Sequence, residues 1–210
     1  MVQTFTFNTL QENTYLIYDE TREAIIIDAG CYSRAEEKLL TDFVSDNQLT
    51  VKALLATHSH IDHVLGNAFV KKTYGVKLHI HPKDETTLRS VKLYAAMYGF
   101  PAFQESEADG FLNEGDIFRF GNTDLKILFV PGHAPGHIAF YNEAEGYVIG
   151  GDVLFKQSIG RTDLPGSDFE VLMHSIRTQF FTLPDQTVVY AGHFGETTIG
   201  EEKKYNPFLK

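Results

Sequence analysis

The sequence predicts an α+β protein in which two β-sheets lie face to face between outer layers of helices. Short apolar runs with strand-like spacing come early in the chain, and later ones alternate with helical patterns. The chain has 210 residues, 43% of them hydrophobic, and no Gly/Ser/Pro linker divides it, so we expect one domain over 1–210. Because a sheet and a helix must each bury an apolar face, helices covering the outer faces of two sheets satisfy both.

The expected elements follow one another along the chain. Three strand-like runs near the start are close enough together to form a meander, and the later strands alternate with helices. The expected strands lie at residues 2–7, 14–18, 24–27, 51–56, 116–130, 138–149 and 187–190. The expected helices lie at residues 34–44, 62–74, 84–97, 168–181 and 196–205.

The strongest chemical signal is the heptad Thr57-His58-Ser59-His60-Ile61-Asp62-His63, which offers four metal-ligating side chains. It follows the apolar run 51–56, so its histidines come at the carboxyl end of a buried strand. In extended chain His58 and His60 point to the same side and could reach one ion. Asp62 and His63 open a helical pattern and diverge by about 100°. This divergence suggests a second ion rather than one crowded site.

Three further strands end in glycine followed by histidine or aspartate. Glycine lets the backbone turn sharply and approach a site closely, which suits strand ends that converge on one cleft. The sequence therefore predicts that these side chains join the heptad. They are His133 and His137 after residues 126–130, Asp152 after 147–149, and His193 after 187–190.

These motifs, in this order and spacing, resemble the metallo-β-lactamase superfamily, and within it the small glyoxalase II-like hydrolases that lack the C-terminal domain of full-length glyoxalase II. The resemblance covers nearly the whole chain and implies a four-layer αββα sandwich. Besides residues 57–63, it is carried by residues 27–30, 131–137, 151–152, 160–166, 197–201 and 206–209.

The resemblance also implies the ligand sets. A first metal would be held by His58, His60 and His133, a second by Asp62, His63 and His193, and Asp152 would bridge them. Asp28 and His137 would lie outside the ligand set, Asp28 steadying a ligand imidazole. Imidazole and carboxylate ligands without thiolate suit two divalent ions, zinc in first place, with iron or manganese as alternatives.

The implied reaction is hydrolysis by a metal-bridging hydroxide, with Asp62 orienting the water and taking its proton. A thiolate leaves readily without a strong general acid, so we expect an acyl thioester such as S-lactoylglutathione as the substrate. Alternatives are a lactone or other ester, an oxidoreductase resembling persulfide dioxygenases, which use a single iron held by two His and one Asp, and a non-catalytic metal-binding module.

Arg161, nine residues after Asp152, is the candidate substrate contact. Glyoxalase II enzymes place a basic residue there for the anionic part of the substrate, and a guanidinium suits a carboxylate. The alternative is an ion pair with Asp163 or Asp168. The chain also lacks the aromatic residue that follows the basic one in glyoxalase II, which leaves glutathione binding open. The roles of Cys31, His79, His81 and His174 stay open, with packing or surface positions expected for them.

The net charge of −10 counts against nucleic acid as a partner, since nucleic-acid binding depends on clustered Lys and Arg. No apolar run is long enough for a membrane span, and the start of the chain does not resemble a signal peptide. We therefore expect a cytoplasmic enzyme with a small-molecule thioester or ester substrate. The sequence does not indicate the oligomeric state.

Overall fold

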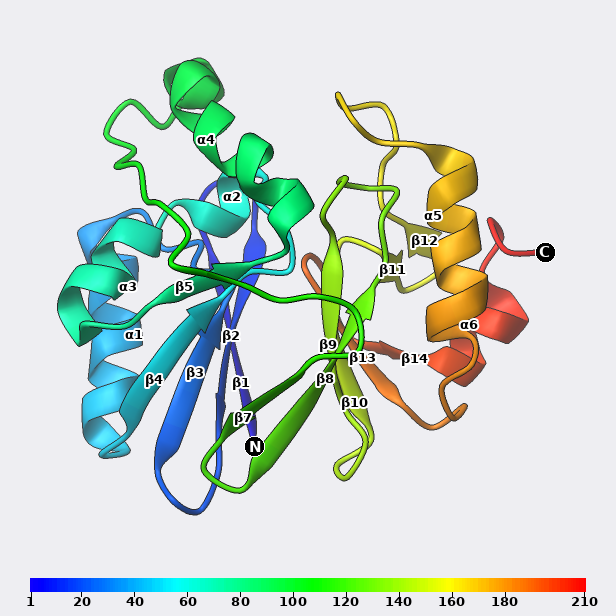
Figure 1. The fold of residues 1–210 in the computed structure, drawn as a ribbon, viewed down its shortest axis with the longest axis horizontal. Helices are drawn as coiled ribbons and strands as arrows, with labels where there is room; N and C mark the ends of the chain where they lie inside the picture. The colour runs from blue at the N-terminus through cyan, green and yellow to red at the C-terminus, as the bar shows by residue number, and fades with distance from the viewer.

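The computed structural model describes residues 1–210 and places two six-stranded sheets face to face (Figure 1). The first sheet has the order β1 (Val2–Phe7), β2 (Glu12–Tyr18), β3 (Glu23–Ile27), β4 (Thr50–Leu55), β5 (Leu78–Ile80), β6 (Gly110–Phe111). The second has the order β14 (Thr197–Thr198), β13 (Val188–Ala191), β10 (Tyr147–Gly151), β9 (Ile138–Asn142), β8 (Thr123–Phe129), β7 (Ile117–Phe120). A small hairpin joins β11 (Leu154–Phe155) and β12 (Ser158–Ile159).

Helices form the two outer layers. In Figure 1, α1 and α3 cover the first sheet, and α5 and α6 cover the second. The predicted four-layer αββα sandwich and the early meander of β1, β2 and β3 are confirmed. The α-helices are α1 (Arg34–Asp46), α2 (Ile61–Val64), α3 (Asn67–Tyr74), α4 (Glu85–Tyr94), α5 (Phe169–Ser175) and α6 (Ile199–Tyr205). Shorter turns are η1 (Pro82–Asp84), η2 (Ala95–Tyr98) and the π-helical η3 (Ile176–Phe180).

The strands alternate between two cores, as period-two side-chain geometry requires. In β3, Ile25 and Ile27 pack between the sheets, whereas Ile26 packs against the helices that cover the first sheet. In β9, Phe140 faces the other sheet and Ala139 faces α5 and η3. Because both faces of each sheet are covered, the central strands read as nearly continuous apolar runs.

Several predicted elements are divided in the structure. The helix expected over 62–74 is two helices, because α2 ends at Val64 and α3 begins at Asn67. Gly66 lies at this break, where a Cβ atom would come within 2.4 Å of the Cys31 sulfur. The expected strands over 116–130 and 138–149 are the hairpins β7–β8 and β9–β10. The sequence does not predict the short strands β5, β6, β11, β12 and β14, since runs of two or three residues carry no periodicity. The helix expected over 196–205 begins only at Ile199, because β14 takes up Thr197–Thr198.

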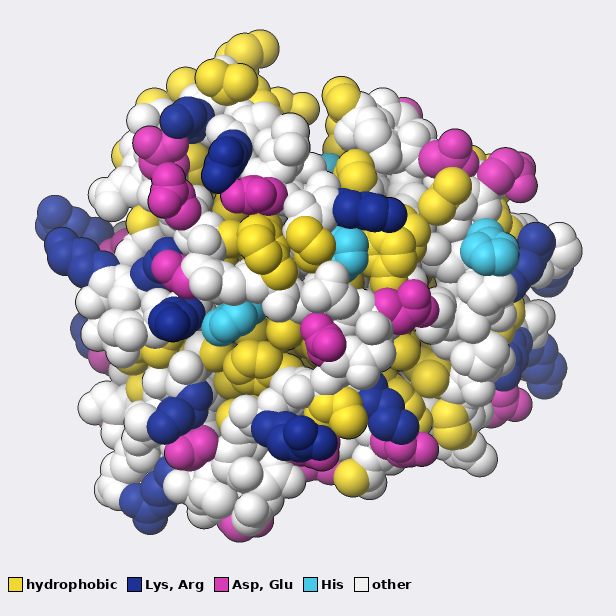
Figure 2. All heavy atoms as spheres, viewed as in Figure 1, with side chains coloured by type: hydrophobic (Ala, Val, Ile, Leu, Met, Phe, Trp, Pro, Cys, Tyr) yellow, Lys and Arg dark blue, Asp and Glu magenta, His cyan; other side chains and the backbone are white.

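The strands that carry the candidate ligands end at the same edge of the sandwich. Strand β3 runs parallel to β4, and β10 runs parallel to β13. Their carboxyl ends meet beneath α4 and the loop before α5, at the top of Figure 1. Figure 2 shows this edge hollowed between two lobes, with hydrophobic side chains on the α4 lobe, where Leu93, Met97 and Tyr98 are exposed. None of the helices is long and apolar enough to cross a membrane.

Candidate metal centre

Three groups of three side chains each bring ligand atoms close enough to surround an ion. One of them, Asp28 with His58 and His63, overlaps the other two, which share no residue. In the first group, His58 and His60 follow β4, and His133 follows β8. In the second group, Asp62 and His63 lie in α2, and His193 follows β13. In each group the ligand atoms lie within 4.8 Å of one another. The structure thus brings together the residues that the sequence placed at separate strand ends, in the two sets that the resemblance implied.

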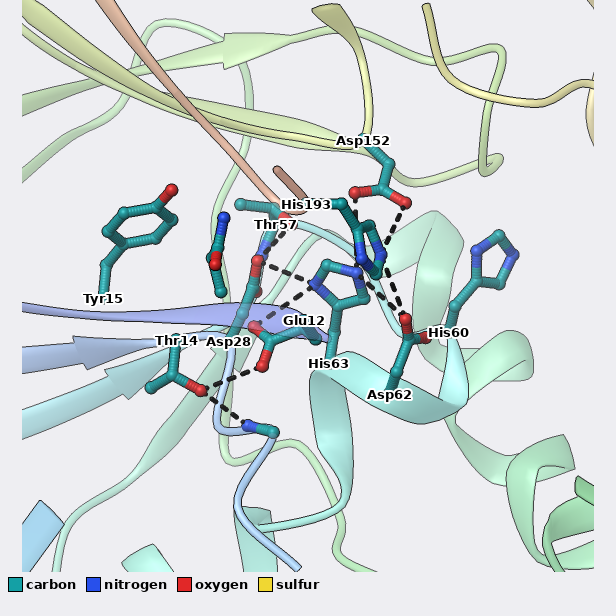
Figure 3. A network of polar contacts seen from close by, with 12 residues as sticks. Glu12, Thr14, Tyr15, Asp28, Thr57, His60, Asp62, His63, Asp152 and His193 are labelled. Atoms are coloured by element: carbon teal, nitrogen blue, oxygen red, sulfur yellow. Dashed lines mark hydrogen bonds and ion pairs between the residues drawn. The ribbon is translucent and has the colours of Figure 1, made fainter. Parts of the chain in front are cut away.

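Asp152, directly after β10, contacts both groups, and Figure 3 shows its contacts with His63 and His193. Its Oδ2 atom is 3.5 Å from Nε2 of His133 in one group and 3.5 Å from Nε2 of His193 in the other. Its Oδ1 atom is 3.6 Å from Nε2 of His63. A carboxylate in this position can contribute one oxygen to each of two ions.

The backbone and neighbouring side chains fix which ring nitrogen faces the centre in His63, His133 and His193. Nδ1 of His133 donates to the carbonyl of Arg161 at 2.8 Å, and Nδ1 of His193 contacts the carbonyl of Gln11 at 3.2 Å. Nδ1 of His63 contacts Asp28 Oδ2 at 3.1 Å. Since Nδ1 carries the proton in each ring, the lone pair of Nε2 is left for the centre.

Asp28, directly after β3, contacts residues of both groups from outside the space between them. It accepts hydrogen bonds from the backbone amide of Thr57 at 2.6 Å and the Thr57 hydroxyl at 2.7 Å, in addition to the contact with His63. The Thr57 oxygen lies 3.0 Å from Nδ1 of His58, and its own proton goes to Asp28, so His58 donates to it. The carboxylate of Asp28 is therefore fully engaged, which fits an orienting role better than a ligand role.

Three atoms of the centre are buried without a hydrogen-bond partner: Nε2 of His58, Nε2 of His63 and Oδ1 of Asp152. Unpartnered buried polar atoms are rare in folded proteins and destabilise them. All three point into the space that the two groups surround, as Figure 3 shows for His63 and Asp152. Divalent cations held by the two groups would satisfy all three, so the residues present fit a metal centre.

Electrostatics prepares most of these groups for a metal. Burial and the neighbouring imidazole of His133 lower the pKa of His60 to about 3, so its ring is neutral and can ligate. Burial opposes the ionisation of Asp152, but the surrounding imidazoles outweigh it and hold the pKa well below its usual value. Burial also opposes protonation of His193, yet hydrogen bonds to Asp152 and Asp62 raise its pKa to about 9. A metal bound by His193 would displace this proton.

His137 follows β8 but does not face the space between the groups. Its ring stacks on His58 with centroids 4.7 Å apart, and its Nε2 accepts a hydrogen bond from the backbone amide of Asp152 at 3.0 Å. The ring therefore helps to fix the position of Asp152 from outside the ligand set.

The sequence reasoning missed a buried polar cluster at the start of β2. Glu12 is fully buried behind His63, and Oε1 of Glu12 lies 3.8 Å from Nδ1 of that imidazole. Burial raises the pKa of Glu12 well above its usual value. The Thr14 hydroxyl donates to Glu12 and accepts from the amide of Gly30 at 2.9 Å (Figure 3). The signal for this cluster in the sequence is a run of polar residues at the start of an otherwise apolar strand.

Asn13, in the same cluster, joins the first sheet to the loop that carries His193. Its side-chain amide donates to the carbonyl of Ala191 at 3.0 Å and to that of Phe194 at 2.8 Å, on either side of the ligand. Its backbone amide donates to the carbonyl of Gly192 at 2.7 Å. We call these three hydrogen bonds the Asn13 clamp, and they fix the backbone around His193.

Replacing Asn13 with alanine should release this backbone. Because one buried and one partly buried carbonyl lose their donor, we expect the free energy of unfolding to fall by about 1–3 kcal/mol in urea denaturation. Metal content should fall at the group that contains His193. Thr6→Val is the control, because it removes only the bond from the exposed Thr6 hydroxyl to the Asn13 oxygen. Equal metal content in both variants would contradict a role for the clamp in positioning His193.

The remaining candidates lie away from the space between the groups. Arg161 is exposed, and its guanidinium forms two hydrogen bonds with Asp163, at 2.6 and 2.8 Å. Cys31 is buried, and burial raises the pKa of its thiol, which makes it a poor nucleophile. The other histidines have local roles: His81 stacks on Phe129, His79 packs against Phe118, and His174 is exposed on α5.

Comparisons with known proteins agree with this architecture. A profile described as the Metallo-beta-lactamase superfamily matches residues 8–193. The chain is 39% identical over 201 residues to hydroxyacylglutathione hydrolase GloC of Haemophilus influenzae, covering 95% of this chain and 93% of that protein. The crystal structure of BLEG-1 B3 metallo-beta-lactamase matches with a TM-score of 0.91 and 34% identity over 100% of both chains. That of TTHA1623 in a di-iron-bound form matches with a TM-score of 0.86 and 34% identity, covering 99% of this chain and 100% of that one. The chain belongs to the metallo-beta-lactamase superfamily.

Proposed function

We propose that this protein is a metal-dependent hydrolase with two divalent ions and that it cleaves an acyl thioester. The observation that carries the proposal is the position of Asp152 between two complete ligand groups, 3.5 Å from an imidazole of each. His58, His60 and His133 would hold one ion, and Asp62, His63 and His193 the other. When bound, such ions supply an activated water at neutral pH and polarise a carbonyl group.

The protein's own residues would orient the reactants. The Asp62 carboxylate is 3.2 Å from Nε2 of His193 and reaches the mouth of the centre. It is placed to orient the attacking water and to accept its proton. A thiolate leaving group needs no strong general acid, and Cys31, the only thiol in the chain, is buried with a raised pKa that makes it a poor nucleophile. Both features suit a thioester substrate.

The relatives give two substrate classes to compare. Hydroxyacylglutathione hydrolase GloC of Haemophilus influenzae supports a thioester, and BLEG-1 B3 metallo-beta-lactamase supports a β-lactam as a second candidate. The persulfide dioxygenase alternative needs a single iron, whereas both ligand groups are complete in this chain. Either zinc or iron suits the ligands, as the di-iron form of TTHA1623 illustrates for a similar protein.

Metal content and substrate preference, measured together, test the proposal. The protein is loaded with zinc, iron or manganese in turn, and its metal is counted by elemental analysis. Each form is then assayed for hydrolysis of S-lactoylglutathione and of a chromogenic cephalosporin. Oxygen uptake with glutathione persulfide is measured with an oxygen electrode. We expect two ions per chain and the highest kcat/KM for the thioester. One ion per chain with oxygen uptake, or a higher kcat/KM for the cephalosporin, would overturn it.

Arg161 tests how the substrate is bound. If the guanidinium binds an anionic tail equally in the ground and transition states, Arg161→Ala should raise KM roughly ten-fold with little change in kcat. Asp163→Ala is the matched control, because it removes the competing carboxylate and should lower KM or leave it unchanged. A neutral thioester should be indifferent to both changes. If both variants instead lower only the melting temperature, the pair is structural.

A further inference from the structure

Phe194, the residue directly after His193, combines an unfavourable backbone with an exposed aromatic ring. Its φ angle is 64°, in the left-handed region that favours glycine, and its side chain is 76% exposed. A bulky residue gains little stability from a ring in water, and the left-handed backbone destabilises the chain further. Such a residue is expected where strain serves a site rather than the fold.

The surroundings hold Phe194 in this conformation. Its carbonyl accepts a hydrogen bond from the Asn13 amide at 2.8 Å, as part of the Asn13 clamp. Its ring lies edge-on to Phe155, with centroids 5.8 Å apart, and Phe155 also lies beside the ring of His193 at 6.3 Å. The aromatic side chain is therefore fixed next to a candidate ligand rather than left to move freely.

Phe194 also lines a cavity of about 240 Å³ that shares His193 with the candidate metal centre. Leu10, a second exposed apolar side chain, lines it from the turn between β1 and β2. The cavity is lined by Thr6, Leu10, Gln11, Asn13, His193 and Phe194. It is uncharged apart from His193, so it is suited to a neutral, partly apolar group.

Arg161, the candidate substrate contact, is joined through its backbone to the other ligand group. The carbonyl of Arg161 is bonded to His133, whereas the cavity borders His193. If the anionic tail of the thioester belongs to its thiol and lies near Arg161, the acyl group points toward His193. We propose that Phe194 and Leu10 bind the apolar acyl group of the substrate and so set acyl specificity. This inference rests on the proposed thioester hydrolysis.

Phe194→Gly is the test variant, because glycine adopts the observed backbone angle without strain. The substrates are the acetyl and phenylacetyl thioesters of one thiol, N-acetylcysteamine. Removing the ring should raise KM for the phenylacetyl thioester roughly ten-fold, leave kcat within two-fold of the parent, and change the acetyl thioester little. The melting temperature should stay the same or rise. Phe194→Asn, which also tolerates this backbone, should show the same selective loss.

Gln48→Gly is the matched control, since Gln48 is exposed, has a φ angle of 55° and lies before the amino end of β4, at the other end of that strand from His58. It should leave both KM values unchanged. The inference would be overturned if Phe194→Gly left KM for the phenylacetyl thioester unchanged or raised KM equally for both thioesters. It would also be overturned if, among thioesters with the same acyl group, the rise in KM depended on the thiol.

A binding measurement separates this inference from the proposed function. If the metal-loaded protein hydrolyses neither thioester, thioester hydrolysis is wrong. Calorimetric titration with the phenylacetyl ketone analogue, in which a methylene replaces the sulfur, then reports on the cavity alone. Roughly ten-fold weaker binding to Phe194→Gly than to the parent would keep the acyl site, and equal binding would reject it.

Discussion

Replacing Asp152 with alanine is expected to have the largest effect on function. The carboxylate contacts imidazoles of both ligand groups, so its loss should weaken metal binding at both. Partners outside a ligand set already contribute about 10- to 100-fold to affinity or activity, so we expect kcat/KM to fall by more than about 100-fold. His193→Ala should instead leave one ion per chain, because the group containing His58 stays complete.

Elemental analysis after dialysis, combined with the thioester assay, checks this result. Asp152→Asn keeps the shape of the side chain but removes its charge, and it should resemble the alanine variant in metal content. If Asp152→Ala retains two ions per chain and parent-like turnover, the position of the carboxylate between the groups has no functional meaning.

Gly132→Ala should have the largest effect on stability. Gly132 precedes His133 with a φ angle of 130°, and a Cβ there would come within 2.3 Å of both the Cα and the backbone nitrogen of Leu172 in α5. The carbonyl of Gly132 also accepts a hydrogen bond from the amide of Asp168 at 2.7 Å. Backbone of a packed helix cannot give way cheaply, so we expect unfolding free energy to fall by at least about 3 kcal/mol.

Gly75→Ala separates this clash from backbone strain alone. Gly75 follows α3 with a φ angle of 66°, and a Cβ there would meet nothing within 4 Å. Alanine at this position should destabilise the protein by only about 1–2 kcal/mol. Urea denaturation of the metal-free protein measures both, and equal losses at the two glycines would show that the contact with α5 contributes nothing.

The ligand positions could be predicted because strand ends are local signals. A buried apolar run followed by glycine and histidine places the histidine at the edge of a sheet, whichever strand is its neighbour. The same runs predict the order of strands and helices, and the family resemblance implies the four-layer sandwich. Which ligands share a group was implied by family resemblance, since spacing along the chain says nothing about distance between the two sheets.

The family resemblance implied the orienting role of Asp28, but two further orienting residues could not be predicted. Glu12 and Asn13 act through contacts with residues more than fifty and more than one hundred and seventy positions away. No local pattern specifies such partners. Similarly, the break between α2 and α3 depends on Gly66 lying against Cys31, a contact that becomes visible only when the helix is packed.

The Asn13 clamp has a consequence for the order in which the centre forms. The bond from Asn13 to Ala191 closes a loop of 178 residues, and that from Asn13 to Phe194 one of 181. Closing a loop this long is slow and entropically unfavourable until other contacts have shortened it. His58 and His60 meet His133 through much shorter loops, so that pocket can form earlier in folding. Metal uptake would then be sequential, and the second ion would report completion of the native structure.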